Sequence, residues 1–141
     1  MAATEFREIV EQVQAALSAF IAGNPEPFKA CWSHGDDVTI FGGWGAYERG
    51  WTHVGPRLDW AAARCSGGEQ SYQPLALEVG GDLAFTVGIE HGDVRLAGQD
   101  TFSPMTSRVT HIYRREGGEW KLIHRHADPG HEVVEVGEPT T

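Results

Sequence analysis

The spacing of the apolar residues changes once along the chain, and this change constrains the fold more than any other feature. In the first half, apolar side chains recur every three or four residues, as between Phe6 and Ile21, which places them on one face of a helix. In the second half they alternate with polar or small residues, as in Leu83, Phe85 and Val87, which is the period of a strand. Helices followed by hairpin-linked strands predict an α+β fold.

The expected elements follow from this pattern and from the glycine-rich turns. We expect helices over residues 5–22, 25–33 and 54–65, and strands over 38–41, 75–79, 83–89, 108–115 and 120–128. Residues 42–50 are expected to form a glycine-rich loop, and residues 94–106 either an irregular connection or strand ends extended into a flap. A curved antiparallel sheet wrapped around three helices would leave a cavity at its open end. Residues 1–128 are thus predicted to be a single domain and residues 129–141 a flexible acidic tail.

The charge of the chain argues against some classes of partner. Twenty acidic residues against eleven basic ones give a net charge of −9, which disfavours nucleic acid and anionic membranes. No apolar run approaches the ~20 residues of a membrane span, and no basic and apolar leader is visible at the N-terminus. Cys31 and Cys65 are expected to be free thiols. We therefore expect a cytoplasmic protein.

One long stretch of the sequence resembles a known superfamily. Residues 108–126, with Arg114-Arg115-Glu116-Gly117-Gly118-Glu119-Trp120 at the centre and His124 and His126 at the end, are similar to the final hairpin of SnoaL-like proteins of the nuclear transport factor 2-like superfamily. They also resemble the association domain of calcium/calmodulin-dependent protein kinase II. Residues 82–90, and the turn between residues 41 and 51, fit the same group, so that the resemblance covers roughly residues 5–128.

This resemblance implies a fold more firmly than a function. It implies a cone-shaped sheet around three helices (a cystatin-like roll), a central pocket, and a dimer through the outer sheet face. The superfold hosts isomerases, dehydratases, polyketide cyclases, epoxide hydrolases, transport factors and oligomerisation modules. The Asp base and the Tyr/Asp pair of the ketosteroid isomerases cannot be placed in this sequence, since Tyr47 and Glu48 match only the region, and neither can the Asp-Arg-Asp arrangement of the epoxide hydrolases.

Glu90 and His111 are the candidate catalytic pair. Ala84, Thr86, Gly88 and Glu90 share one parity of their strand, and small residues ending in a carboxylate suit a face that lines a cavity. His111 shares a face with Tyr113 on the next strand. A direct Glu90–His111 pair would make the imidazole more basic and provide an acid/base group. The alternative is a cross-strand pair that only satisfies hydrogen bonds. A buried Glu90 carboxylate needs a cationic or hydrogen-bonding partner, and His111 and Arg125 on the following strands are the nearest candidates.

The last strand offers two faces with different possible roles. Trp120, Leu122, His124, His126 and Asp128 share one parity, and a His-x-His followed by an Asp can contribute metal ligands. The set is incomplete, and the resemblance makes these histidines structural, so that no metal and no cofactor are expected. The resemblance then places Arg125 and Ala127 on the pocket side, with Arg125 as a ligand-binding candidate.

Aromatic residues supply the remaining ligand-binding candidates. Trp44 and Tyr47 lie in the glycine-rich loop, where they are able to cover an apolar or ring-shaped ligand, or else to anchor a corner of the core. Trp60 on the third helix and Tyr113 on the penultimate strand complete the set. The glycines lack the Lys-Ser/Thr ending of a phosphate loop.

Two classes of function remain open on the sequence alone. The first is a pocket protein for a small apolar molecule, acting as a cofactor-independent isomerase, dehydratase or cyclase. The second is a non-catalytic dimerisation module or a regulatory ligand-binding module. A homodimer is expected in both cases, because the sheet faces carrying Phe85, Val87, Ile89 and Trp120 have more apolar area than three helices on one side can cover.

Overall fold

The computed structural model describes residues 2–129 and confirms the α+β class. Three helices come first: α1 (Ala2–Ile21), α2 (Glu26–Ala30) and α3 (Trp51–Ala62). The strands are β1 (Thr39–Phe41), β2 (Tyr47–Arg49), β3 (Cys65–Gly80), β4 (Leu83–Leu96), β5 (Ser103–Glu116) and β6 (Glu119–Pro129). The expected tail lies outside the described residues, apart from Pro129, which ends β6.

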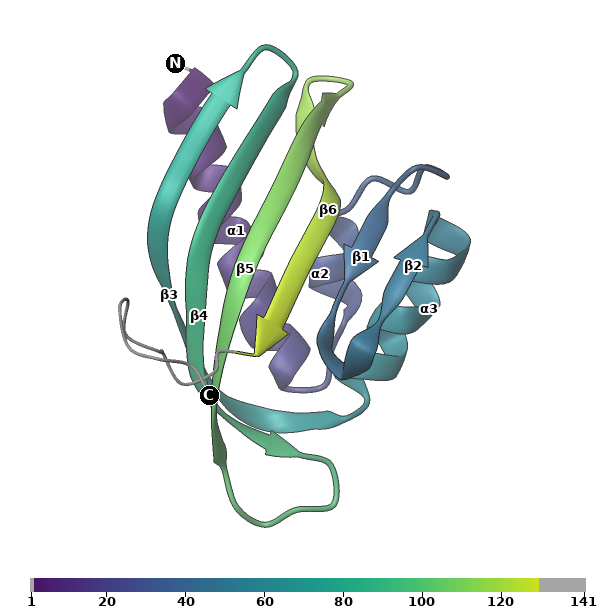
Figure 1. Cartoon of the computed structure of the whole chain (residues 1–141), viewed down its shortest axis with the longest axis vertical. Coiled ribbons are helices and arrows are strands. Elements are labelled where there is room, and N and C mark those ends of the chain that lie inside the picture. Colours follow the sequence, from purple (N-terminus) through teal and green to yellow (C-terminus); the bar gives the residue numbers. More distant parts are fainter. Residues whose placement is uncertain (1, 130–141) are drawn as a thin grey trace, which may run out of the picture.

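All six strands form one curved sheet in the order β2-β1-β6-β5-β4-β3. The long strands β3 to β6 are antiparallel neighbours, whereas β1 pairs with β6 in parallel. The sheet is therefore mixed at this one pairing, where a fully antiparallel sheet was expected. Helices α1 and α2 lie together on one side of the sheet, behind the long strands, and α3 lies beside β2 (Figure 1).

Three segments differ from the sequence-based expectation. The third helix ends at Ala62, and β3 begins at Cys65, so that Gly67 and Gly68 belong to a strand and not to a turn after the helix. The glycine-rich loop contains the short strand β2, which pairs with β1. Strand β4 runs to Leu96 and strand β5 begins at Ser103. Of the two alternatives for residues 94–106, the structure therefore shows strand ends extended into a flap.

Local irregularities in the strands determine which side chains point inward. The register between β5 and β6 shifts between Ile112 and Tyr113, because Ile112 pairs with His124 and Tyr113 pairs with Leu122, which leaves Ile123 as an extra residue. Such a bulge reverses the alternation of the strand that carries it. Trp120 and Leu122 are buried before the bulge, and Ala127 is buried after it.

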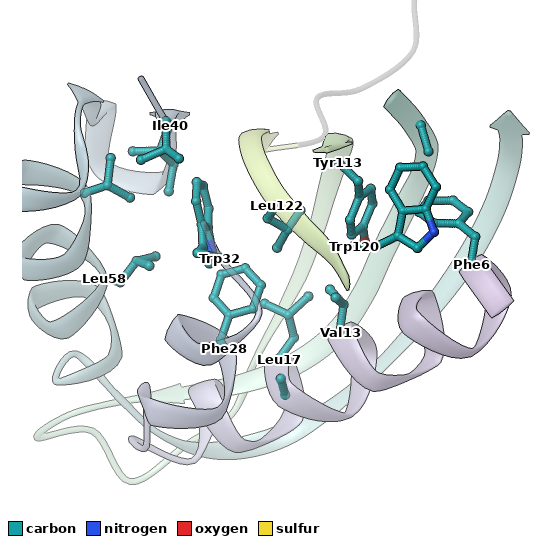
Figure 2. Packing of buried hydrophobic residues seen from close by; sticks show 14 residues of the cluster. Phe6, Val13, Leu17, Phe28, Trp32, Ile40, Leu58, Tyr113, Trp120 and Leu122 are labelled. Atoms are coloured by element: carbon teal, nitrogen blue, oxygen red, sulfur yellow. The ribbon is translucent and has the colours of Figure 1, made fainter. Parts of the chain in front are cut away.

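The hydrophobic core fills the space between α1 and the sheet. Figure 2 shows Phe6, Tyr113 and Trp120 grouped at the start of α1, with Leu17, Phe28 and Trp32 farther along. Phe6 packs edge-on against Tyr113 and Trp120, with ring centroids 4.8 and 5.4 Å apart. Trp120 is only 3% exposed, so its expected place on the outer sheet face was wrong. The bulge at Ile123 explains this error, since strict alternation would have put Trp120 on the side of His124.

Candidate functional site

A cavity of about 460 Å³ opens at the end of the sheet away from the Phe6 cluster. Its walls come from the C-terminal half of α1, from α2, from α3, from the loop after β1 and from the flap ends of β4 and β5. The lining is mostly apolar, with Glu90 and Arg125 among its few charged groups. This size and this mixture are typical of sites for small molecules.

The predicted inner face of β4 is confirmed in part. Ala84, Thr86 and Glu90 are buried, whereas Leu83 and Phe85 are exposed on the other face. Only Glu90 of the inner residues lines the cavity. A Cβ atom at Gly88 would overlap the ring of Tyr72 from β3, so that this position must remain a glycine for the tyrosine to lie there. The strip from Ala84 to Gly88 was expected to line the cavity, but it is covered and does not belong to the lining.

Arg125 lies between the two residues of the predicted catalytic pair. Its Nη1 and Nη2 atoms donate to the Glu90 carboxylate at 2.8 and 2.9 Å, which is a bidentate ion pair. Nη1 also lies 2.9 Å from His111 Nε2. The expected direct bond between Glu90 and His111 is replaced by this bridge. All three residues come from neighbouring strands, because β4 pairs with β5 and β5 with β6, and His111 lies directly opposite Arg125.

The bridge fixes the state of His111. A guanidinium can only donate, so Nε2 of His111 is the acceptor and the ring proton sits on Nδ1. Burial and the positive charge of Arg125 hold the pKa of His111 well below its ordinary value. The direct pair that would have made the imidazole more basic is not formed, and the charge nearest to His111 is a cation and not the carboxylate. His111 is 1% exposed and does not line the cavity.

The guanidinium of Arg125 remains charged despite its burial. Burial works to lower the pKa of Arg125, but the Glu90 carboxylate outweighs it and leaves the pKa above its ordinary value. Three of its five N–H groups are used by Glu90 and His111. The side chain of Arg125 also belongs to the lining of the cavity.

The four aromatic residues predicted to bind a ligand lie in different parts of the structure. Trp44 lines the cavity and is 53% exposed, with a left-handed backbone (φ 58°) inside the short 3₁₀ turn Gly43–Gly45. Trp60 does not line the cavity but meets Trp44 edge-on, at 5.5 Å between ring centroids. Tyr47 is 79% exposed on β2, outside the cavity lining, and Tyr113 is wholly buried in the core, where burial raises its pKa. Trp44 alone of these four is placed to touch a ligand.

Sequence reasoning missed Arg57, which also lines the cavity. Its guanidinium carbon lies 3.9 Å from the centre of the Trp60 ring, and that of Arg64 lies 3.4 Å from it. The spacing of three and four residues on a helix places these side chains together and was the signal available in the sequence.

The histidines of β6 lie outside the cavity. His124 Nδ1 is 2.7 Å from the Thr39 hydroxyl, and Phe41 packs edge-on against the rings of His124 and His126. Within residues 2–129, no group of three or more His, Cys, Asp and Glu side chains could hold a metal ion. In the same part of the chain, none of the helices has the length and apolar character that crossing a bilayer requires.

Solved structures share this fold at low sequence identity. A nuclear transport factor 2-like superfamily protein from Salmonella enterica is 18% identical and matches with a TM-score of 0.77 over 99% of this chain and all of its own. A candidate dehydratase of the same family from Streptomyces avermitilis is 20% identical, with a TM-score of 0.74 over 89% of this chain and 96% of its own.

A candidate calcium/calmodulin-dependent protein kinase type II association domain from Thiobacillus denitrificans is 17% identical, with a TM-score of 0.68 over 87% of this chain and 93% of its own. No curated protein matches the sequence. The SnoaL-like domain family, in contrast, matches residues 9–129, which include all the strands and most of the helical part described above. The chain therefore belongs to the SnoaL-like domain family.

Proposed function

We propose that the chain binds one small, mostly apolar molecule in the cavity and acts on it by cofactor-independent acid/base chemistry, as an isomerase, dehydratase or cyclase does. The observation that carries this proposal is the Glu90–Arg125 pair in the wall of a mostly apolar cavity. A carboxylate and a cation in surroundings of low polarity act more strongly on a substrate than they would in water. The neighbour from Streptomyces avermitilis is named as a candidate dehydratase, which is one of these reaction classes.

The proposal gives a different role to each group. Glu90 is its proton acceptor, because Glu90 is the residue of the catalytic pair that lines the cavity. The unused N–H groups of Arg125 would stabilise the negative charge that develops on a carbonyl oxygen when a neighbouring carbon loses its proton. His111, which was predicted to be catalytic, is in this proposal a positioning residue, because it reaches the cavity only through Arg125. Trp44 covers the apolar body of the ligand.

Proton abstraction can be tested without knowing the substrate. The probe is 4-phenylcyclohexanone in D₂O, and exchange of the protons beside its carbonyl is followed by NMR. The protein should accelerate the exchange, and Glu90→Gln should remove about 10²-fold or more of the acceleration, as general-base catalysis contributes roughly that much. His53→Gln is the control, since His53 is exposed on α3 and does not line the cavity. Exchange at the uncatalysed rate would contradict the catalytic proposal.

We also propose that the outer face of the sheet forms a homodimer, as expected for either function. Leu83 and Phe85 on β4 are exposed, and so is Leu75 on β3. Both α1 and α2 lie on the other side of the sheet (Figure 1). Exposed apolar faces of this kind are often interfaces. Light scattering should give twice the mass of the chain, and Phe85→Lys should give the monomer. A monomeric wild type at micromolar concentration would contradict this.

The alternative function is a non-catalytic assembly or regulatory module. It is favoured by the same outer face and by the neighbour named as an association domain. The free thiols Cys31 and Cys65 support a cytoplasmic location for either function. A dimer that binds apolar ketones without exchanging their protons would favour this alternative.

A further inference from the structure

The two arginines that line the cavity differ in what balances their charge. Arg125 is neutralised by Glu90 through two hydrogen bonds. Arg57 forms no ion pair with any residue in the range 2–129. The cavity therefore holds one cation whose charge no described carboxylate neutralises, and this cation is on α3, whereas the Glu90–Arg125 pair is on the sheet.

The hydrogen bonds of Arg57 are also incomplete. Its Nη2 atom reaches the carbonyl oxygens of Gly43 and Trp44 at 3.4 and 3.3 Å, which is long for a charged donor. Its Nε atom is buried, with no hydrogen-bond partner among the described residues. A buried donor without an acceptor is costly, although the rest of the Arg57 side chain is partly exposed.

The orientation of Arg57 is nevertheless fixed. Its guanidinium stacks on the ring of Trp60, and Arg64 also stacks on this ring. The Nη2 atom of the guanidinium contacts the carbonyl oxygens of Gly43 and Trp44 in the loop after β1. A planar fork of donors held in one orientation is suited to a carboxylate, which accepts two parallel hydrogen bonds.

We propose that Arg57 is a second recognition point in the cavity and binds a carboxylate on the ligand. The ligand class is thus an organic monoacid whose apolar body fills the cavity, with its acid group at Arg57 and a neutral polar group directed to Arg125. A single negative charge matches the single unbalanced cation, whereas a phosphate dianion would add a charge to a chain of net charge −9. This inference rests on the proposed small-molecule function and names the substrate class for that site.

The test compares two probes that differ only in charge. Binding of 3-phenylpropanoate and of its neutral amide, 3-phenylpropanamide, is measured by calorimetry with the full chain. The carboxylate should bind at least about tenfold more tightly, which is the effect of one good charge-assisted contact. Its affinity should also fall with added salt, while that of the amide should not. Phenyl phosphate is the third probe and should bind more weakly than the carboxylate.

Variants test whether Arg57 causes the preference for the carboxylate over the amide. Arg57→Gln should bring the two probes to equal affinity, and Arg57→Lys should restore part of the preference. Arg64→Gln is the matched control, because Arg64 stacks on the same tryptophan but does not line the cavity, and it should keep the full preference.

The outcomes separate this inference from the function on which it rests. Equal binding of both probes to the wild type, or a preference that survives Arg57→Gln, would overturn the role of Arg57 and leave the binding pocket in place. Tighter binding of phenyl phosphate would overturn the carboxylate class. Failure of all three probes to bind would contradict the small-molecule pocket, and the role of Arg57 with it.

Discussion

The two ends of the space between α1 and the sheet are filled differently, and α2, α3 and the loop after β1 border only the open end. At the start of α1, Phe6 packs against Tyr113 and Trp120, and all three are buried. At the end of α1, Phe20 is only partly buried and lines the cavity. The sheet provides large aromatic rings at the first end, whereas at the second it contributes no Phe, Tyr or Trp side chain and includes the small residues Gly92 and Ser107.

Along α1 and the long strands the two ends thus differ in their side chains, and α2, α3 and the loop after β1 complete the walls of the cavity. Between the two ends lies the layer formed by Glu90, His111 and Arg125. These polar groups separate the packed end from the open end. They are at once part of the core and part of the cavity wall, so that changes in them are expected to affect both stability and binding.

The largest expected effect distinguishes the packed end from the open end. Phe6→Ala should lower the free energy of unfolding by about 3–5 kcal/mol, because it leaves a void between two aromatic rings. Phe20→Ala makes the same change on the same helix, yet it should cost less than half as much, since that ring already borders open space. Chemical denaturation of both variants measures the difference. Equal losses would contradict the division of the core into two ends.

The second prediction concerns the polar layer. Arg125→Met should cost about 3 kcal/mol of unfolding free energy, because it leaves the Glu90 carboxylate buried without its partner. The double variant Glu90→Gln, Arg125→Met should recover much of that loss. The control is Arg108→Met, which breaks the ion pair between Arg108 and Asp128, whose side chains are 63% and 35% exposed, and should cost at most about 1 kcal/mol. No recovery in the double variant would show that the loss came from packing.

The sequence predicted the inner face of β4 correctly, and the reason is physical. Strict alternation over residues 83–90 separates bulky from small side chains, so that burial of one parity is fixed. The same reasoning failed on β6, because one extra residue at Ile123 reverses the alternation. That bulge has no clear signal in the sequence, and Trp120 was therefore assigned to the wrong face.

The residues of the candidate site were predictable, and their contacts were predictable in part. The strand pattern and the family resemblance together selected Glu90, His111 and Arg125, and the structure brings all three together. Which of them touch depends on side-chain length and rotamer, and the long guanidinium of Arg125 inserts between the other two. The direction of the pKa shift at His111 follows from that contact, so it too was beyond the sequence.

The smallest expected effect concerns pH and tests whether His111 is neutral behind the cavity wall. In the folded protein its pKa is held below the ordinary value of about 6.5 that the unfolded chain has. As the pH falls below about 6.5, the unfolded chain therefore binds a proton that the folded protein does not accept. Acidification must then destabilise the fold through this residue, by at most about 1.4 kcal/mol per pH unit.

The measurement is the free energy of unfolding of the wild type and of His111→Gln between pH 7.5 and 5.5. The glutamine variant cannot take up this proton, so its stability should fall less steeply over the lower part of that range, whatever its stability at pH 7.5. His124, whose pKa burial also lowers, contributes in the same direction in both proteins and cancels in the comparison. NMR of the imidazole signals should show His111 still neutral at pH 6. Parallel pH profiles for the two proteins would mean that His111 has the same pKa in the folded and unfolded chain, and that the Arg125 bridge does not hold it as described.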